Sequence, residues 1–460
     1  WGGGVFRPTN DANFEVGNAF LDDVGAPFDG YLNGLVVRTG GVQLVEVAGG
    51  VGDVISQDDT ADIILVRANS DGVSADGSFD GIFGSIFSGH DIDIIEIGHG
   101  LIGPGSGPLA GAGIFATSFI DTVRDSTNAT STVIPNIEGV ITSASFDRNI
   151  DPLNPRVAPI AGINSIQLTR GGSIRDAYIA TSTRLDEFWT SSAYQNFRVF
   201  FGTMNQIRLT GGDIFRSTLE FNSLNTLQLT NGFFDASYMN VRGEVTNTIE
   251  AAGFRNSTIG GDLLEFRLSR IIVAEDLERL RAVNGDIVDT SIQVTGSVIR
   301  AITANSIVRT TVGVSNTLNS IVLASDMLAS NITTGQLKTM TVGNSIRTSG
   351  INVSGPLISL SVMNEISRSE ITVSGPDGRI DMITVVNDIG ADITSSGRVG
   401  TIASTMGDIR GSISTTTDRG DIALISAFRD LAIETDIAGD LVAIEAGRNI
   451  GDANNPSVIL

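Results

Sequence analysis

A short apolar pattern recurs seven times between Leu318 and Leu460 at nearly constant intervals. Each copy has an apolar residue, two arbitrary residues and a second apolar residue. The copies start 19, 20, 23, 19, 23 and 19 residues apart and are Leu318/Ile321, Leu337/Met340, Leu357/Leu360, Ile380/Ile383, Val399/Ile402, Ile422/Ile425 and Leu441/Ile444. Two further apolar positions follow in the copies. A period near 20 that holds three short apolar segments predicts a coil with three strands per turn, whose turns bury their inner faces by stacking.

Two other positions of the repeat indicate sharp bends. The residue two before the third apolar position is small in successive copies: Ser330, Ser349, Ser369, Ala391 and Gly411. Asn344, Asn364 and Asn387 occupy one equivalent place, two residues before the second strand. Asn tolerates the left-handed backbone conformation of a bend, and stacked amides can hydrogen-bond from layer to layer. We therefore predict a structural ladder at these three Asn residues; the alternative is that Asn is simply common in turns.

The prediction for the whole chain is an all-β, right-handed parallel β-helix (β-solenoid) with about three strands and 19–23 residues per turn. The handedness comes from the general rule for parallel crossovers. Residues 1–90 are expected to form an irregular N-terminal β cap or strand-exchange region, and residues 91–317 less regular turns with loop excursions. Residues 318–460 are expected to form regular turns that end in an uncapped apolar strand. The segment Ala274 to Val283 could be a helical turn, but its Leu277 and Leu280 spacing favours another solenoid turn.

The balance of charged residues limits the partners. The chain has 29 Lys and Arg against 52 Asp and Glu, a net charge of −23, so we expect no nucleic-acid partner and an affinity for divalent cations. Cysteine is absent, which excludes disulfides and thiolate metal sites. No apolar run is long enough for a membrane span. The start at Trp1, without a leader, favours an exported extracellular or cell-surface protein whose signal has been removed.

Two clusters could bind a metal. Asp71, Asp76 and Asp80 are each followed by Gly, and calcium prefers several oxygens on a sharply turning loop. The spacing matches neither the helix-loop-helix calcium motif nor the nonapeptide calcium repeat of β-rolls, and Asp-Gly is also a common plain turn. The histidines His90 and His99 flank a run of Asp and Glu that could be a metal or acid–base site. The alternative is that polar residues merely point outward from a half-exposed strand.

An aromatic segment around Trp189 and Tyr194 could stack on sugars, although buried aromatics in a wide turn would explain the same residues. We find no phosphate-binding Gly-rich loop, Ser-His-Asp order or zinc spacing, and one lysine and two histidines leave few catalytic bases. We assign no catalytic residues, and calcium is the one cofactor considered.

Turns of the type Gly-Asp-Ile or Asn-Asp-Ile, such as those at Gly285, Asn387, Gly407 and Gly420, complete the pattern. With the repeated apolar segments, they resemble right-handed parallel β-helix proteins of the pectin-lyase-like type, and large exported surface proteins of planctomycetes especially. The resemblance covers about two thirds of the chain. Enzymes of that family cut acidic polysaccharides with a calcium-bound carboxylate cluster and an Arg or Lys base, or with paired Asp residues. None of those motifs can be placed on this sequence.

The resemblance and the composition together favour a non-catalytic structural protein. We expect an extracellular scaffold, the protomer of a surface filament or sheath, that binds itself head to tail by stacking its ends. The residues expected at those ends are Trp1, Val5, Phe6, Val458, Ile459 and Leu460. One alternative is a β-helix protein that binds or degrades a cell-surface polysaccharide. A further alternative is the stalk of a larger adhesin.

Overall fold

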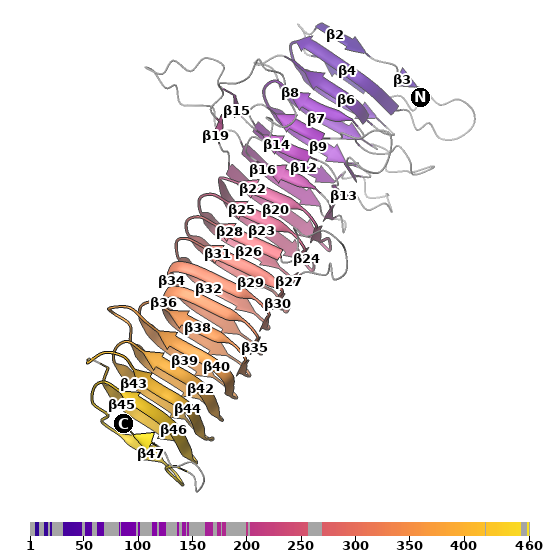
Figure 1. The fold of residues 1–460 in the computed structure, drawn as a ribbon. Helices are drawn as coiled ribbons and strands as arrows, with labels where there is room; N and C mark the ends of the chain where they lie inside the picture. Colours follow the sequence, from indigo (N-terminus) through magenta and orange to yellow (C-terminus); the bar gives the residue numbers. More distant parts are fainter. Residues whose placement is uncertain are drawn as a thin grey trace, which may run out of the picture. The chain divides into compact units, whose positions relative to one another are not determined.

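All regular structure in the described part of the chain is β-strand (Figure 1). The strands stack in parallel into a β-solenoid of about 14 turns, which confirms the predicted fold class. By compactness the chain divides into unit 1, Trp1–Glu244, and unit 2, Val245–Leu460. This computed structural model describes residues 5–8, 13–16, 19–20, 31–47, 51–57, 62–68, 82, 84–97, 100–101, 113–116, 119–125, 136–137, 140–143, 145–146, 162–168, 173–175, 177–180, 199–200, 203–255, 269–418, 420–451 and 458–459.

Unit 1 contains three parallel stacks of strands, one for each side of the coil. Stack A consists of β5 (Val42–Val47), β7 (Ile63–Ala68), β9 (Ile92–Ile97), β12 (Phe119–Asp125), β16 (Gly162–Leu168), β20 (Thr203–Thr210) and β23 (Ser223–Thr230). Stack B consists of β10 (Gly100–Leu101), β13 (Asn136–Ile137), β17 (Ile174–Arg175), β21 (Ile214–Phe215) and β24 (Phe233–Asp235). Stack C consists of β4 (Tyr31–Thr39), β6 (Val51–Ser56), β8 (Ser85–Ser88), β11 (Gly113–Ala116), β14 (Val140–Ser143), β18 (Tyr178–Ala180), β22 (Thr218–Phe221) and β25 (Tyr238–Val241). A separate antiparallel pair joins β15 (Ser145–Phe146) to β19 (Val199–Phe200).

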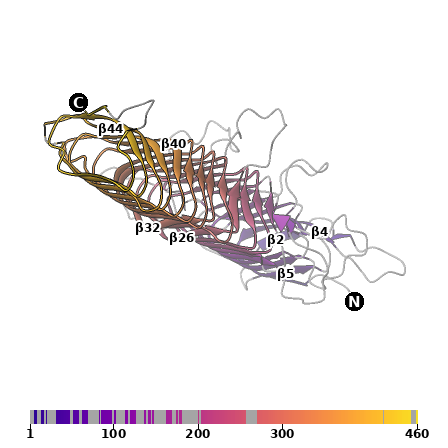
Figure 2. The ribbon, with the colours of Figure 1, turned by 90° about the horizontal axis from the view of Figure 1, so that it is seen from below.

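Unit 2 repeats the three stacks, and Figure 2 shows its turns as closed loops. Stack A consists of β26 (Val245–Ala251), β29 (Leu277–Ala282), β32 (Val298–Ala304), the ends of β34 (Thr311–Leu323) and β36 (Asn331–Val342), β39 (Leu357–Val362), β41 (Ile380–Val385), β43 (Val399–Ser404), β45 (Ile422–Ala427) and β47 (Ile444–Ala446). Stack B begins with β27 (Gly253–Arg255), β30 (Ile287–Val288), β33 (Ile307–Val308), β35 (Met327–Leu328) and β37 (Ile346–Arg347). Stack C begins with β28 (Ser269–Val273), β31 (Thr290–Val294), the starts of β34 and β36, and β38 (Gly350–Val353). Stacks B and C then join in β40 (Ile366–Val373), β42 (Ile389–Ser395), β44 (Ile409–Thr415) and β46 (Leu431–Ile437), and β48 (Val458–Ile459) pairs with β46.

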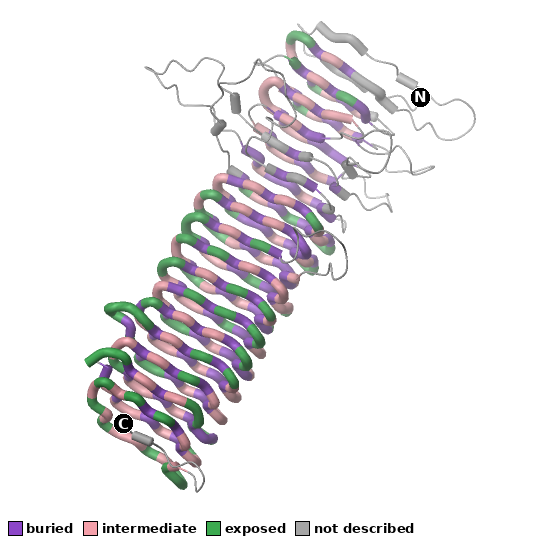
Figure 3. Tube along the Cα trace, in the orientation of Figure 1, coloured by how far each residue is buried: buried purple, intermediate pink, exposed green. Residues whose placement is uncertain are grey.

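The core is the shared interior that the turns enclose (Figure 3). The predicted apolar pairs stack on each other in register: Leu337 pairs with Leu357, and Met340 with Leu360. Each of these four residues is at most 1% solvent-exposed. Each fully buried Leu, Ile or Met contributes roughly 1.5–3 kcal/mol, so the repeated pattern supplies the main driving force for stacking. The segment around Leu277 and Leu280 is β29, a solenoid turn and not a helix.

The small residues predicted at a bend lie where stack B meets stack C, here called the B–C corner. Ser330, Ser349 and Ser369 are each less than 8% exposed. The Ser349 hydroxyl donates to the Arg347 carbonyl (2.8 Å) and accepts from the Ser330 amide (3.2 Å). At this corner the residue that precedes each Ser or Thr has a left-handed backbone conformation. These preceding residues are Arg216, Ala236, Asp289, Arg309, Ala329, Thr348 and Arg368. The corner is thus a column of buried hydroxyls that satisfies the backbone of a sharp bend.

The first turn is covered by antiparallel strands. β1 (Val5–Pro8) pairs with β5, while β2 (Asn13–Val16) and β3 (Ala19–Phe20) pair with β4. Because β4 and β5 pair in parallel with β6 and β7 on their other side, the cap occupies the edge that the first turn would otherwise leave open. In the described residues no helix has the length and apolarity that crossing a membrane requires.

Candidate functional site

Several residues singled out from the sequence lie outside the described residues. They are Trp1, Asp71, Asp76, Asp80, His99, Trp189, Tyr194 and Leu460. The calcium site and the sugar-stacking site therefore remain predictions. Val5 and Phe6 lie on β1, which pairs with β5, and Val458 and Ile459 lie on β48, which pairs with β46. Both predicted end segments thus pair within their own chain.

The three predicted ladder residues hydrogen-bond to one another between stacks A and B of unit 2. The Asn387 amide donates to the Asn364 side-chain oxygen (2.8 Å), and the Asn364 amide donates to the Asn344 oxygen (3.1 Å). Asn344 in turn donates to the Asp326 carboxylate (2.8 Å). A carboxylate accepts hydrogen bonds but has none to donate, so Asp326 terminates the ladder.

A second amide ladder, not identified from the sequence, runs along stack A of unit 1. Asn225 donates to Asn205 (2.8 Å), Asn205 to Asn164 (2.8 Å) and Asn164 to Asp121 (2.7 Å). This ladder also terminates on an aspartate, at the end nearer the N-terminus. Its members are 43, 41 and 20 residues apart, and such uneven spacing hides the column in the sequence.

The second ladder ends beside a cluster of carboxylates and one imidazole at the start of β7 and β9. Ile63 stacks on Ile92, and this register places Asp62 next to Asp91. The His90 Nδ1 atom lies 2.7 Å from Asp62 Oδ1 and 3.6 Å from Asp91 Oδ2. Asp91 Oδ1 is held by the Phe119 amide (2.9 Å). The sequence singled out His90 and Asp91, but Asp62 comes from the preceding turn.

Asp62, His90 and Asp91 form the group of described residues that can hold a metal ion. Two carboxylates and an imidazole suit several divalent cations. All three side chains are partly solvent-accessible, with 41%, 41% and 31% exposed. Burial raises the pKa of the neighbouring Asp93, and the carboxylates of Asp62, Asp121 and Asp91 raise it further. The carboxylates of Asp62, Asp91 and Asp121 lie around Asp93, and this concentration of negative charge attracts a cation or a proton.

A column of alternating charges crosses the same turns on stack A. Glu46, Arg67, Glu96 and Arg124 stand opposite one another in consecutive strands β5, β7, β9 and β12. The Glu96 side chain is 1% exposed and accepts hydrogen bonds from Arg67 Nε and from Arg124 Nε (3.0 Å). Burial by itself would raise the pKa of Glu96, but the hydrogen bonds and charges of Arg67 and Arg124 outweigh burial and lower it.

Comparison of the chain with protein-family models, with curated proteins and with solved structures returned no match. The described side chains make bonds chiefly from turn to turn, in the amide ladders, the hydroxyl column and the charge column.

Proposed function

We propose that this chain is a non-catalytic structural protein, an extracellular scaffold that assembles end to end into a surface filament or sheath. The observation that carries the proposal is the exposed apolar turn Leu441–Ile450. Ile450 stacks on Leu431 and is 55% exposed, whereas Leu431 is 0% exposed. Leu441 and Ile444, at the positions of the buried Ile422 and Ile425, are also partly exposed. A second copy stacked on this turn would bury these side chains and pair their backbone.

The ladders support a scaffold role because they join successive turns by side chains as well as by backbone. A solenoid is held mainly by contacts between neighbouring turns, so its resistance to local opening depends on each junction. The Asn344–Asn364–Asn387 ladder and the hydroxyl column add polar bonds at junctions that the apolar core already stabilises. These bonds are directional, and they fix the register of one turn on the next.

The cap determines how a second copy could stack. β1, β2 and β3 occupy the edge of β4 and β5, so the exposed turn of another copy can reach that edge only if these strands leave it. We therefore propose assembly by strand exchange, in which the cap is displaced. An antiparallel cap of short strands is suited to this because it contributes fewer paired residues than a complete turn.

Negative-stain electron microscopy of three variants tests the proposal. Deleting residues 1–22 removes β1–β3, and we expect it to increase filament formation at high protein concentration. Ile450→Lys places a charge on the exposed turn and is expected to abolish filaments. Ile299→Lys is the matched control, because Ile299 is 41% exposed on the side of β32, away from the last turn. Compact, monodisperse particles for both the native chain and the deletion variant would refute end-to-end assembly.

A further inference from the structure

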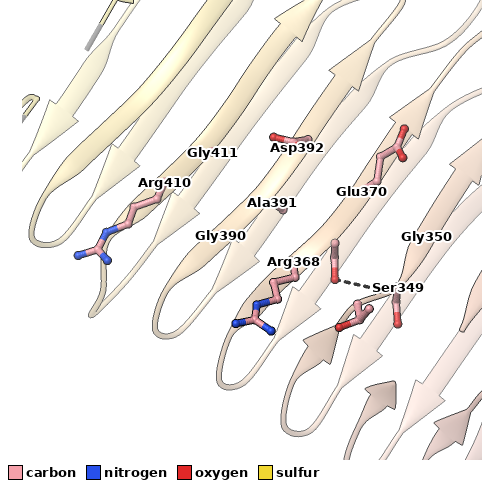
Figure 4. A pocket seen from close by; sticks show the side chains of 11 residues that line it. Ser349, Gly350, Arg368, Glu370, Gly390, Ala391, Asp392, Arg410 and Gly411 are labelled. Atoms are coloured by element: carbon pink, nitrogen blue, oxygen red, sulfur yellow. Dashed lines mark hydrogen bonds between the residues drawn. The ribbon is translucent and has the colours of Figure 1, made fainter. Parts of the chain in front are cut away.

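A groove of about 660 Å³ crosses the B–C corner in unit 2. Its floor includes Gly390 and Ala391, and its sides carry Arg368, Arg410, Glu370 and Asp392. Figure 4 shows Arg368 and Arg410 extending from one side, and Glu370 and Asp392 from the other. We call this the corner groove.

The corner groove arises because the bend becomes one residue shorter between two turns. Ile366 and Ile371 are five residues apart, whereas the equivalent Ile389 and Ile393 are four apart. The extra residue is Arg368, which has φ of 50° and falls in the register shift between Ser367 and Ser369. The next turn has no residue at this place, and Gly390 and Ala391 fill little of the space. The arginine therefore stands at the edge of a step in the surface.

The charges on the two sides of the groove face solvent. Arg368 is exposed, and the Arg410 side chain is 65% exposed although it donates to Asp408 (2.8 Å). A guanidinium has five N–H groups, so Arg410 can bond further acceptors. On the acidic side, Glu370 accepts from the Thr372 hydroxyl (2.9 Å) and Asp392 from the Ser412 hydroxyl (2.7 Å). Neither hydroxyl neutralises a carboxylate, so this side keeps its negative charge.

We propose that the corner groove is a side-by-side docking surface for a second copy of this chain. The surface has a positive side and a negative side. Two copies of such a surface are complementary when they are related by a two-fold axis parallel to the direction in which the turns stack. That rotation places the arginine side of each copy on the acidic side of the other. A two-fold axis along the strands would place arginine on arginine, so the pairing is parallel.

The turn spacing fits this arrangement. Arg368 and Glu370 belong to one turn, and the next two turns supply Asp392 and Arg410. Turns stack about 4.8 Å apart, so Arg368 of each copy faces Glu370 of the other at the same level. Arg410 then lies one turn from the facing Asp392, within reach of its long side chain. The net charge of −23 repels a second copy over the rest of the surface, so the local complementarity selects this face.

Sedimentation velocity over a range of protein concentrations tests the pairing. All variants carry I450K, which removes end-to-end assembly, so a failure of this inference is separate from a failure of the proposed function. Because the interface covers only three turns, we expect dimers at high concentration. R368E/R410E makes both sides acidic and E370R/D392R makes both basic. Each variant alone is expected to lose at least about tenfold in association constant, because like charges then face each other.

One mixture and one further variant give the decisive results. Equal amounts of R368E/R410E and E370R/D392R are expected to form a heterodimer, and the variant with all four substitutions is expected to pair with itself again. D289R/R309D is the matched control, because it reverses an exposed ion pair (2.7 Å) at the same corner, outside the groove, and should leave the dimer unchanged. Circular dichroism confirms that each variant is folded. A monomeric mixture, or a dimer in R368E/R410E as strong as in the I450K parent, would overturn the inference.

Discussion

Replacing Glu96 with Gln tests whether the charge column stabilises the turns of unit 1. Both Glu96 oxygens accept from arginines, Oε2 from Arg67 and Oε1 from Arg124. A glutamine has one acceptor oxygen, so its NH₂ group must face one arginine as a second donor. We therefore expect Glu96→Gln to lose at least one bond outright and to weaken the others.

The expected loss of stability in Glu96→Gln follows from the number of hydrogen bonds that Glu96 accepts. Three hydrogen bonds reach Glu96, from Arg67 Nε, Arg124 Nε and Arg124 Nη2. A hydrogen bond that involves a charged group contributes about 1.5–3 kcal/mol, so the one bond that is lost outright and the weakening of the other two cost roughly 3 kcal/mol in total. The arginine side chains are 28% and 37% exposed and recover part of this by hydration, which lowers the expected cost to about 2 kcal/mol. The control Glu46→Gln affects one bond (3.1 Å) at a 31% exposed side chain and should cost less than about 1 kcal/mol.

Native-state hydrogen exchange is the appropriate assay, because a solenoid can open locally. Amides of β7, β9 and β12 should lose protection in Glu96→Gln, while those of unit 2 should not. The lowered pKa of folded Glu96 means that its contribution is complete above the ordinary glutamate pKa and disappears as pH falls through the lowered value. The difference between the native chain and Glu96→Gln should therefore shrink in acid. Equal protection in both proteins at neutral pH would refute the reasoning.

Two substitutions test the polar ladders of unit 2 by urea denaturation. Asn364→Leu removes the acceptor of Asn387 and the donor to Asn344, and should lower the free energy of unfolding by about 1–3 kcal/mol; an unchanged urea midpoint would show that the ladder is not stabilising. Ser349→Ala leaves the buried Ser330 amide and the Arg347 carbonyl without this hydroxyl and should cost about 1–2 kcal/mol. Ser412 is only partly buried, so Ser412→Ala made in parallel should cost less, and equal losses would contradict the importance of burial.

The repeat predicted the fold and one ladder because both depend on equal spacing. Leu337, Leu357 and Ile380 recur at nearly constant intervals, stack in register and enclose the core. Asn344, Asn364 and Asn387 occur at equivalent positions of the same copies, so their hydrogen bonds are predictable from the sequence. The shortened bend at Gly390 can also be recognised in the sequence from the spacing of the isoleucines. The groove that this bend creates on the surface cannot.

The other clusters could not be predicted from the repeat, because their members come from turns that are longer than the 19–23 residues of the regular turns. Asp62 and His90 are 28 residues apart, and Glu96 is 29 residues from Arg67 and 28 from Arg124. No single period relates these intervals to those of the regular repeat. Their proximity follows from the stacking of Ile63 on Ile92 and of Ile95 on Val123.

The amino-acid pattern alone therefore determined that the chain coils with three strands per turn around an apolar interior. It did so because inward side chains must recur wherever a strand passes the core, whatever the outer residues are. The tertiary structure decided which polar side chains meet, because their partners lie on neighbouring turns, and loops of different length separate those turns along the chain. The buried apolar residues set the register, and the register places Asp62 beside His90, Glu96 between two arginines and Arg368 at the edge of the corner groove.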